Sequence, residues 1–250
     1  MTDTIIETRG LTKDFRGFIA VGGVDLKVRK GSIHALIGPN GAGKSTVFNL
    51  LTRFLPASGG QIFFKGEEIT RRDPALVAQS GMVRSFQISS TFPAFSLRDN
   101  VRIALQRPLQ VSYQFWRSDK TLAALYERAD ELLEAVGLTR WRDVRAADLS
   151  YGRKRALELA TTLALDPEVM LLDEPMAGLG HEDIARIASL IRKVAVGRTV
   201  LMVEHNLKVV ADLSDTITVL ARGKILAEGP YAVVSANPLV RSAYMGSAHA

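Results

Sequence analysis

The chain has 250 residues, 47% of them hydrophobic and 23% charged, which excludes a disordered or fibrous protein and predicts one core, with at most a smaller lobe attached. It has no cysteine, no secretory signal and no run of about 18 apolar residues, so we expect a soluble protein without disulfides, zinc ribbons or iron–sulfur clusters. The 32 Lys and Arg against 26 Asp and Glu leave a net charge of +6 that is spread along the chain, a weak hint of nucleic acid, lipid headgroups or phosphorylated ligands as partners.

Short apolar runs alternate with helical patterns along the chain, which predicts an α/β fold with a partly parallel sheet. The first clear strand spans residues 31–38 and ends in a glycine loop. A one-faced helix follows it, predicted from apolar residues at helical spacing: Val47, Leu50, Leu51, Phe54 and Leu55.

The middle of the chain, from about Arg98 to Asp148, shows no convincing strand after one at Val101–Leu105. Apolar residues at helical spacing from Leu122 to Val136, followed by Gly137, predict a helix. Residues 106–120 are less regular and predict an inserted loop. A mostly helical lobe of about 60 residues therefore interrupts the α/β core.

Acidic and polar residues follow two strands in the second half. The strand at Val169–Leu172 leads into Asp173 and Glu174, and the strand at Thr199–Val203 leads into Glu204 and His205. A helix that contains Ile184, Ile187, Ala188, Ile191 and Val194 joins them, and Gly197 suits its C-terminal end.

The strongest motif lies between the first strand and its helix and fits G-x-x-x-x-G-K-[ST]. Its glycines allow the backbone N–H groups to wrap around phosphate at the helix N-terminus. Lys44 would reach the β- and γ-phosphates, and the Ser45 hydroxyl would bind Mg²⁺. The nine predicted phosphate-binding residues are Gly38, Pro39, Asn40, Gly41, Ala42, Gly43, Lys44, Ser45 and Thr46.

A catalytic or binding role for four further residues is indicated only because this loop is present. Asp173 and Glu174 alone would more often cap a turn, but in phosphoryl transfer one acid holds Mg²⁺ and its neighbour polarises the attacking water. His205 alone would be an ordinary strand-end histidine, although a neutral imidazole there would bind a γ-phosphate or the attacking water. Gln87 alone would be an exposed strand-end amide.

The order of GPNGAGKST, Gln87 in VRSFQ, LSYGR at 149–153, VMLLDEP and His205 resembles the ATP-binding cassette of ABC proteins from about Ile5 to Leu226. The resemblance implies one domain over residues 1–250: a P-loop NTPase core with an antiparallel β subdomain (about 1–97 and 149–250) and an inserted α-helical subdomain (about 98–148). It also implies a head-to-tail dimer that holds each ATP between one subunit's phosphate loop and the other's signature motif.

The same resemblance assigns roles to individual residues. Phe15, rather than Phe18, would stack on adenine, while Ser150 and Gly152 of the signature would contact the ATP held by the partner subunit. Ser45, Gln87 and Asp173 would bind Mg²⁺, Asp173 through water, and Gln87 would relay ATP occupancy to a membrane partner. Catalysis would use Glu174 as general base, His205 as γ-phosphate sensor and Lys44. The implied cofactors are ATP and Mg²⁺.

Two departures from the family pattern stand out. LSYGR replaces LSGGQ, so Tyr151 and Arg153 are substitutions, and Met176–Gly180 ends in Gly where Asp is usual. Because the four residues Lys44, Gln87, Glu174 and His205 are present, we still expect ATP hydrolysis. The lost carboxylate weakens the case for tight communication between the two sites.

Five features resemble the ATP-binding subunits of bacterial branched-chain amino acid importers, a group that includes transporters of urea and other amides or amino-acid-like solutes. They are LSYG, SFQ, EHN, the long aromatic insertion at Gln106–Lys120 and the tail NPLVRSAYMG. This implies a second, identical or non-identical cassette, two permeases and, indirectly, a periplasmic binding protein. The chain would lie on the cytoplasmic face of the inner membrane, and no nucleic acid partner is expected.

Three alternatives stay open. A lipopolysaccharide-export cassette shares the length and tail, although its motifs are usually closer to LPQ and LSGGE. A soluble ABC ATPase acting on nucleic acid or ribosomes would fit the net charge, but it predicts a heptad insertion, a Cys cluster or tandem cassettes, which are missing here. A regulatory cassette without turnover would not need Glu174 and His205.

Overall fold

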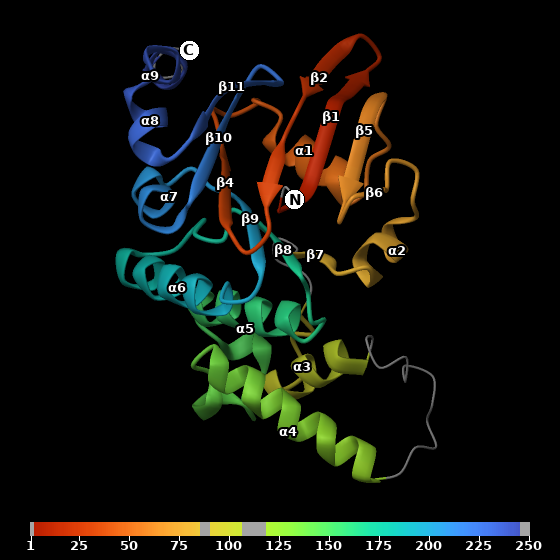
Figure 1. Cartoon of the computed structure of the whole chain (residues 1–250). Coiled ribbons are helices and arrows are strands. Elements are labelled where there is room, and N and C mark those ends of the chain that lie inside the picture. The colour runs from red at the N-terminus through yellow and green to blue at the C-terminus, as the bar shows by residue number, and fades with distance from the viewer. Residues whose placement is uncertain (1–2, 86–90, 107–118, 246–250) are drawn as a thin grey trace.

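The computed structural model describes residues 3–85, 91–106 and 119–245, and these residues form two sheets with helices around them (Figure 1). The smaller sheet is antiparallel, with strand order β2-β1-β5-β6 and β3 paired to β1. Its strands are β1 (Thr4–Phe15), β2 (Phe18–Val24), β3 (Lys27–Arg29), β5 (Gly59–Phe64) and β6 (Glu67–Glu68).

The larger sheet has the strand order β11-β10-β4-β9-β8-β7. The strands from β10 to β7 run parallel, and β11 is antiparallel to β10. Parallel neighbours end at the same edge of a sheet, so the segments that follow β4, β7, β8 and β9 meet there. The strands are β4 (Ile33–Ile37), β7 (Met82–Ser85), β8 (Val169–Asp173), β9 (Thr199–Val203), β10 (Thr216–Ala221) and β11 (Lys224–Gly229).

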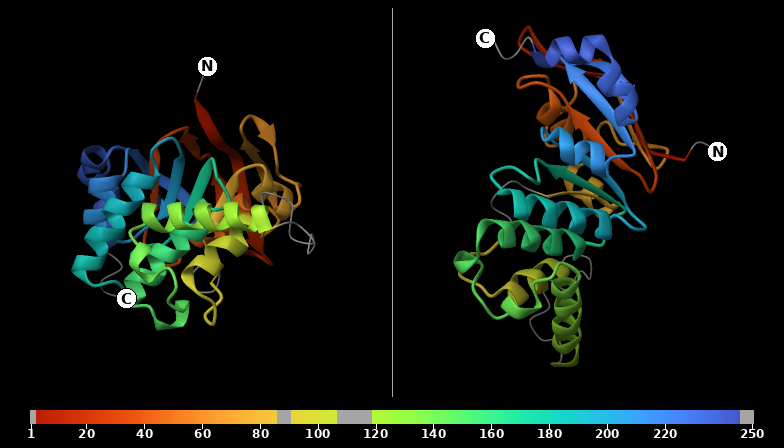
Figure 2. Two further views of the ribbon diagram at one scale, coloured as in Figure 1. Left: turned by 90° about the horizontal axis from the view of Figure 1, so that it is seen from below. Right: turned by 90° about the vertical axis from the view of Figure 1, so that its left-hand side faces the viewer.

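The central strands β4, β8 and β9 are buried on both faces, and alternate residues enter two separate cores. On β8, Met170 and Leu172 face one core while Leu171 faces the other. The first core holds residues from α3 (Leu97–Gln106), α4 (Asp119–Ala135), α5 (Tyr151–Leu163), α6 (His181–Val194) and α7 (Leu207–Leu213). The second core holds residues from α1 (Lys44–Leu51) and from the antiparallel sheet. The larger sheet therefore separates α1 from α5 (Figure 2).

Three further helices each add one buried valine to these cores: Val77 to the second, and Val234 and Val240 to the first. Helix α2 (Pro74–Gln79) starts at Asp73, whose side chain accepts the Ala75 N–H, and the final helices are α8 (Tyr231–Ala236) and α9 (Pro238–Met245). Within the described part of the chain, no helix has the length and apolar character that crossing a bilayer requires.

The predicted strand at Val101–Leu105 is wrong, because these residues belong to helix α3. Leu97, Val101 and Leu105 are buried at intervals of four residues, which places them on one helical face against α4 and α5. The helix predicted from Val47 to Leu55 ends earlier, at Leu51, because Arg53 has φ +62° and breaks the helical conformation. The strands at 169–172 and 199–203 and the helices at 122–136 and 184–194 are confirmed.

Candidate functional site

The glycine loop runs from the end of β4 to the start of α1, and two of its glycines are required by close packing. A Cβ on Gly38 (φ +152°) would lie 2.1 Å from the Leu220 carbonyl oxygen, and one on Gly43 (φ +102°) would lie 2.5 Å from the Ala20 carbonyl oxygen. Neither position accepts a side chain without moving the backbone. The loop is therefore packed between β10 and β2, and this packing fixes its backbone conformation.

Lys44 lies across this loop and is 8% exposed. Its Nζ donates to the carbonyl oxygens of Gly38 (2.7 Å) and Pro39 (3.0 Å). Burial lowers the pKa of the Lys44 ammonium, and the charges of Glu174 and Asp173 act in the opposite direction. The structure therefore brings Lys44 within electrostatic range of both acids.

The N-terminus of α1 has no side-chain cap, because Gly43 occupies the cap position. The first N–H groups of a helix have no partner within the helix and attract anions. Ser45 is exposed in this first turn and Thr46 is half-buried, while Ala42 is buried below them. This end of the helix has the groups that phosphate binding needs.

Asp173 ends β8, is 8% exposed, and accepts a hydrogen bond at Oδ2 from Nη2 of Arg84 at 2.5 Å. The Nη1 of Arg84 donates to the Asn49 side-chain oxygen on α1. Sequence reasoning did not single out Arg84, although an arginine near the end of a mostly apolar strand is a usable signal. Its ion pair joins β7, β8 and α1 behind the acid.

Glu174 follows Asp173 in a tight turn with φ +47°, and its N–H donates to the Val203 carbonyl oxygen at 2.9 Å. His205 is exposed two residues beyond Val203, after β9. Strand β9 lies between β4 and β8, so His205 follows the strand that separates the glycine loop from the two acids. The sheet order therefore assembles the predicted phosphate, acid and histidine residues at one edge.

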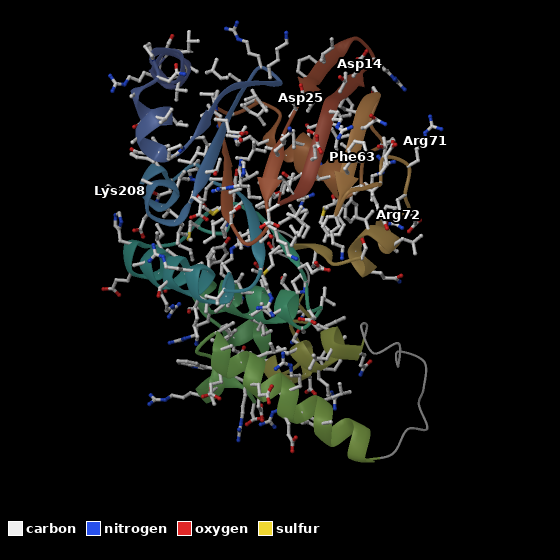
Figure 3. The ribbon with its side chains drawn as sticks, viewed as in Figure 1. Asp14, Asp25, Phe63, Arg71, Arg72 and Lys208 are labelled. Atoms are coloured by element: carbon white, nitrogen blue, oxygen red, sulfur yellow. The ribbon has the colours of Figure 1, made fainter. Side chains whose placement is uncertain are left out.

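Phe15 ends β1 in its hairpin with β2, the strand that approaches the glycine loop. Arg16 and Gly17 both have positive φ, as a tight hairpin turn requires, and Asp14 accepts the Gly17 N–H at 2.6 Å. Figure 3 labels Asp14 at this turn. The Phe15 ring is 43% exposed, and the Lys13 ammonium lies 5.1 Å from its centre. The neighbouring β2 contacts the glycine loop through the Ala20 carbonyl.

Ser150 is the N-cap residue of α5, as predicted, and is exposed without a side-chain capping hydrogen bond. Gly152 is buried, and a Cβ there would lie 2.5 Å from the Asp183 carboxylate. The substituted Tyr151 receives a hydrogen bond from Arg155 (2.8 Å) and lies against Gly178. Since α5 and α1 pack on opposite faces of the sheet, Ser150 and Gly152 belong to a different surface from Lys44.

Gln87 and most of the insertion at 106–120 lie outside the described residues. Strand β7, which leads toward Gln87, pairs with β8 through Ser85 and Leu172. The described residues contain no group of three or more His, Asp or Glu arranged to hold a metal by themselves. A buried carboxylate on Asp173 and an exposed hydroxyl on Ser45 are hard oxygen donors, which suits Mg²⁺ bound together with a phosphate.

Comparison with known proteins agrees with this geometry. The family described as ABC transporter matches residues 21–177, and the family described as branched-chain amino acid ATP-binding cassette transporter matches residues 224–250. The chain is 38% identical to the high-affinity branched-chain amino acid transport ATP-binding protein BraF of Pseudomonas aeruginosa, over 99% of this chain and 100% of that protein. It is 34% identical to LivG of Escherichia coli, with the same coverage.

Solved structures give the same result. The ADP conformation of MJ1267, an ATP-binding cassette of an ABC transporter, superimposes with a TM-score of 0.85 at 30% identity, covering 97% of this chain and 99% of that one. A nucleotide-free cassette gives 0.84, also at 30% identity, covering 96% and 98%. The chain belongs to the ATP-binding cassettes of ABC transporters, which are ATPases. Within that class it falls in the family of branched-chain amino acid transport ATP-binding proteins.

Proposed function

We propose that this ATPase energises the uptake of branched-chain amino acids, or of closely related amino acids, through two membrane permeases. The names of BraF and LivG, with which the chain aligns over 99% of its length, support this substrate class and favour it over lipopolysaccharide export or ribosome binding. The chain would act at the cytoplasmic face of the inner membrane with a second cassette and, indirectly, a periplasmic binding protein.

The observation that carries the catalytic part is that Lys44, Asp173 and Glu174 lie at or just after the ends of strands that meet at one sheet edge. There, burial lowers the pKa of the Lys44 ammonium and the charges of both acids raise it. Lys44 and the α1 N-terminus would hold the phosphates, and Ser45, Gln87 and Asp173 would hold Mg²⁺, which neutralises charge on the transferred phosphoryl group. Glu174 would take the proton of the attacking water. His205 would contact the γ-phosphate.

The remaining predicted residues complete two ATP sites in a head-to-tail dimer. Phe15 offers an exposed ring for stacking on adenine, and its position near the loop is supported by the β2 contact to Gly43. Ser150 and Gly152 would bind the partner subunit's ATP, because the uncapped Ser150 hydroxyl and the α5 N-terminus can receive an anion from outside the chain.

A permease would dock on an apolar cavity of about 490 Å³ that opens between α1, α2, α3 and α5. Phe54 and Phe92 line it and are about half exposed, and Leu76 on α2 lies nearby with 51% exposure. Arg84 and Ser85 of β7 also line the cavity, so a partner seated there would contact the strand that leads to Gln87. We further propose that residues of about 98–148 form a helical subdomain beside this cavity.

The test is a matched pair of variants, Glu174→Gln and Glu168→Gln, each assayed for ATP hydrolysis alone and for leucine uptake after reconstitution with the permeases. Glu168 lies just before β8, at the opposite end from Glu174, and its exposed carboxylate pairs with Lys65. We expect Glu174→Gln to bind ATP normally but to lose hydrolysis and uptake roughly a hundredfold or more. Glu168→Gln should keep both activities.

Two results would contradict the proposal. Unchanged hydrolysis in Glu174→Gln would remove the general-base role. If Glu174→Gln loses hydrolysis as expected but the unmodified complex takes up no leucine, the ATPase assignment stands and the proposed substrate class is refuted.

A further inference from the structure

Glu204 is a buried carboxylate to which the proposed mechanism gives no role. It follows β9, directly before His205, and is 0% exposed. A carboxylate removed from water must be satisfied by hydrogen bonds or by a cation. Here three backbone N–H groups satisfy it.

The three donors come from two different loops. Oε1 accepts the N–H of Met176 at 3.0 Å, and Oε2 accepts the N–H groups of His205 and Asn206, each at 2.9 Å. Met176 belongs to the loop after β8 and lies 28 residues from Glu204. The two oxygens of one side chain are thus divided between the acid loop and the histidine loop.

Both loops carry residues of the proposed site. Met176 is two residues after Glu174, whose φ of +47° is sterically costly and persists only when neighbouring contacts hold it. Glu174 is already tied to β9 through the Val203 carbonyl oxygen, and the Glu204–Met176 bond adds a second tie on the other side of the turn. The same carboxylate holds the main chain of His205.

We propose that Glu204 is a positioning residue that holds the general-base loop and the His205 loop in one fixed relation. It touches neither nucleotide nor water itself. Its effect falls on the catalytic step because that step requires Glu174 and His205 to address the same γ-phosphate and attacking water. The donors to Glu204 are Met176, His205 and Asn206, none of which belongs to the phosphate loop, so ATP affinity does not depend on it. The inference rests on the proposed roles of Glu174 and His205.

The test is Glu204→Gln, which keeps the shape but has only one acceptor oxygen. Whichever way the amide turns, its NH₂ faces an N–H donor of one loop. Asp215→Asn is the matched control, because Asp215 also accepts a backbone N–H, that of Ile33 at 2.8 Å, near the opposite end of the sheet. In that variant the amide oxygen can turn to Ile33 and keep the bond.

We expect Glu204→Gln to lower kcat at least tenfold while the Kd of a fluorescent ATP analogue stays within twofold of the unmodified protein. Asp215→Asn should stay within twofold in both. A smaller fall in kcat for Glu204→Gln, or a larger rise in its Kd, would overturn the proposal. A purely structural residue would change thermal stability without lowering kcat selectively while the Kd stays unchanged.

If Glu204→Gln does not fold, hydrogen exchange in the unmodified full chain decides. One carboxylate holding both loops means that the Met176 and His205 amides exchange with protection factors within tenfold of each other. A larger difference would show that the loops open independently and would overturn the proposal.

The variants Glu174→Gln and His205→Ala in the same assay separate two kinds of failure. If either retains full turnover, the catalytic role proposed for that residue has failed, and with it the premise of this inference. If both lose turnover while Glu204→Gln retains it, only the positioning role has failed.

Discussion

The glycine loop and the edge formed by Asp173, Glu174, Glu204 and His205 are built in different ways. The loop is one continuous segment of nine residues, and the groups proposed to bind phosphate are its backbone N–H groups and one lysine. The edge comes from two strands, and its side chains meet only because β8 and β9 are paired in parallel with Asp173 opposite Val203. A one-residue slip in that pairing would turn the acids to the other face of the sheet.

The difference teaches how each region tolerates change. The loop depends on the absence of side chains, since its backbone touches Leu220 and Ala20. The edge depends on the presence of buried polar partners, such as Arg84 for Asp173. We therefore expect the loop to be destabilised by substitutions that add a side chain, and the edge by substitutions that remove a charged partner.

The largest effect is expected from Gly38→Ala. A Cβ 2.1 Å from the Leu220 carbonyl oxygen forces the loop away from β10, which should cost about 4 kcal/mol of stability and weaken ATP binding roughly a hundredfold. Urea unfolding and nucleotide titration measure the two effects. Gly41→Ala is the control, because Gly41 also has positive φ but has open space around it, so only about 1 kcal/mol of strain is expected. Equal effects of the two variants would mean that packing does not distinguish these glycines.

The next effect is expected at the edge, from Arg84→Met. This change leaves the buried Asp173 carboxylate without its guanidinium partner and should lower the free energy of unfolding by about 3 kcal/mol. The double variant Arg84→Met/Asp173→Asn removes the charge as well, so it should regain much of that loss. Urea unfolding of the four proteins in this cycle measures the coupling. A double variant as unstable as the sum of the single changes would show that the pair contributes no coupling.

The smallest effect concerns β4, the strand that carries the loop. Its His34 is 1% exposed and donates to the Thr218 hydroxyl, which donates in turn to Glu228. Burial, with a smaller contribution from Arg29, lowers the pKa of His34 to about 4. Between about pH 6.5 and pH 4, the His34 imidazole is therefore protonated in the unfolded chain but neutral in the native protein. The free energy of unfolding thus decreases as the pH falls through this window.

Between pH 7 and pH 5 this histidine should account for a loss of about 2 kcal/mol. His34→Gln keeps a donor toward Thr218 but does not titrate. Urea unfolding at both pH values should show a loss smaller by about that amount in the variant. Parallel losses in the two proteins would mean that His34 does not cause the pH dependence.

Some of the site was predictable because its signal is local. The glycine loop was predicted from nine adjacent residues. Asp173, Glu174 and His205 each follow an apolar strand, but their roles were assigned only because that loop is present and because the motif order resembles an ATP-binding cassette. The prediction of a strand at Val101–Leu105 was wrong because a short apolar run is compatible with either a strand or a helix. In the structure, the burial of Leu97, Val101 and Leu105 on one face favours the helix.

Taken alone, the sequence determined the family, the phosphate loop, the acidic pair and the order in which they occur along the chain. The tertiary structure alone decided which distant groups hold them: Arg84 beside Asp173, 89 residues away, Leu220 above Gly38, and Glu204 between two loops. The physical reason is that a motif records groups whose spacing the local backbone sets. A buried ion pair or a carboxylate shared by two loops depends instead on strand order and register, which no short segment contains.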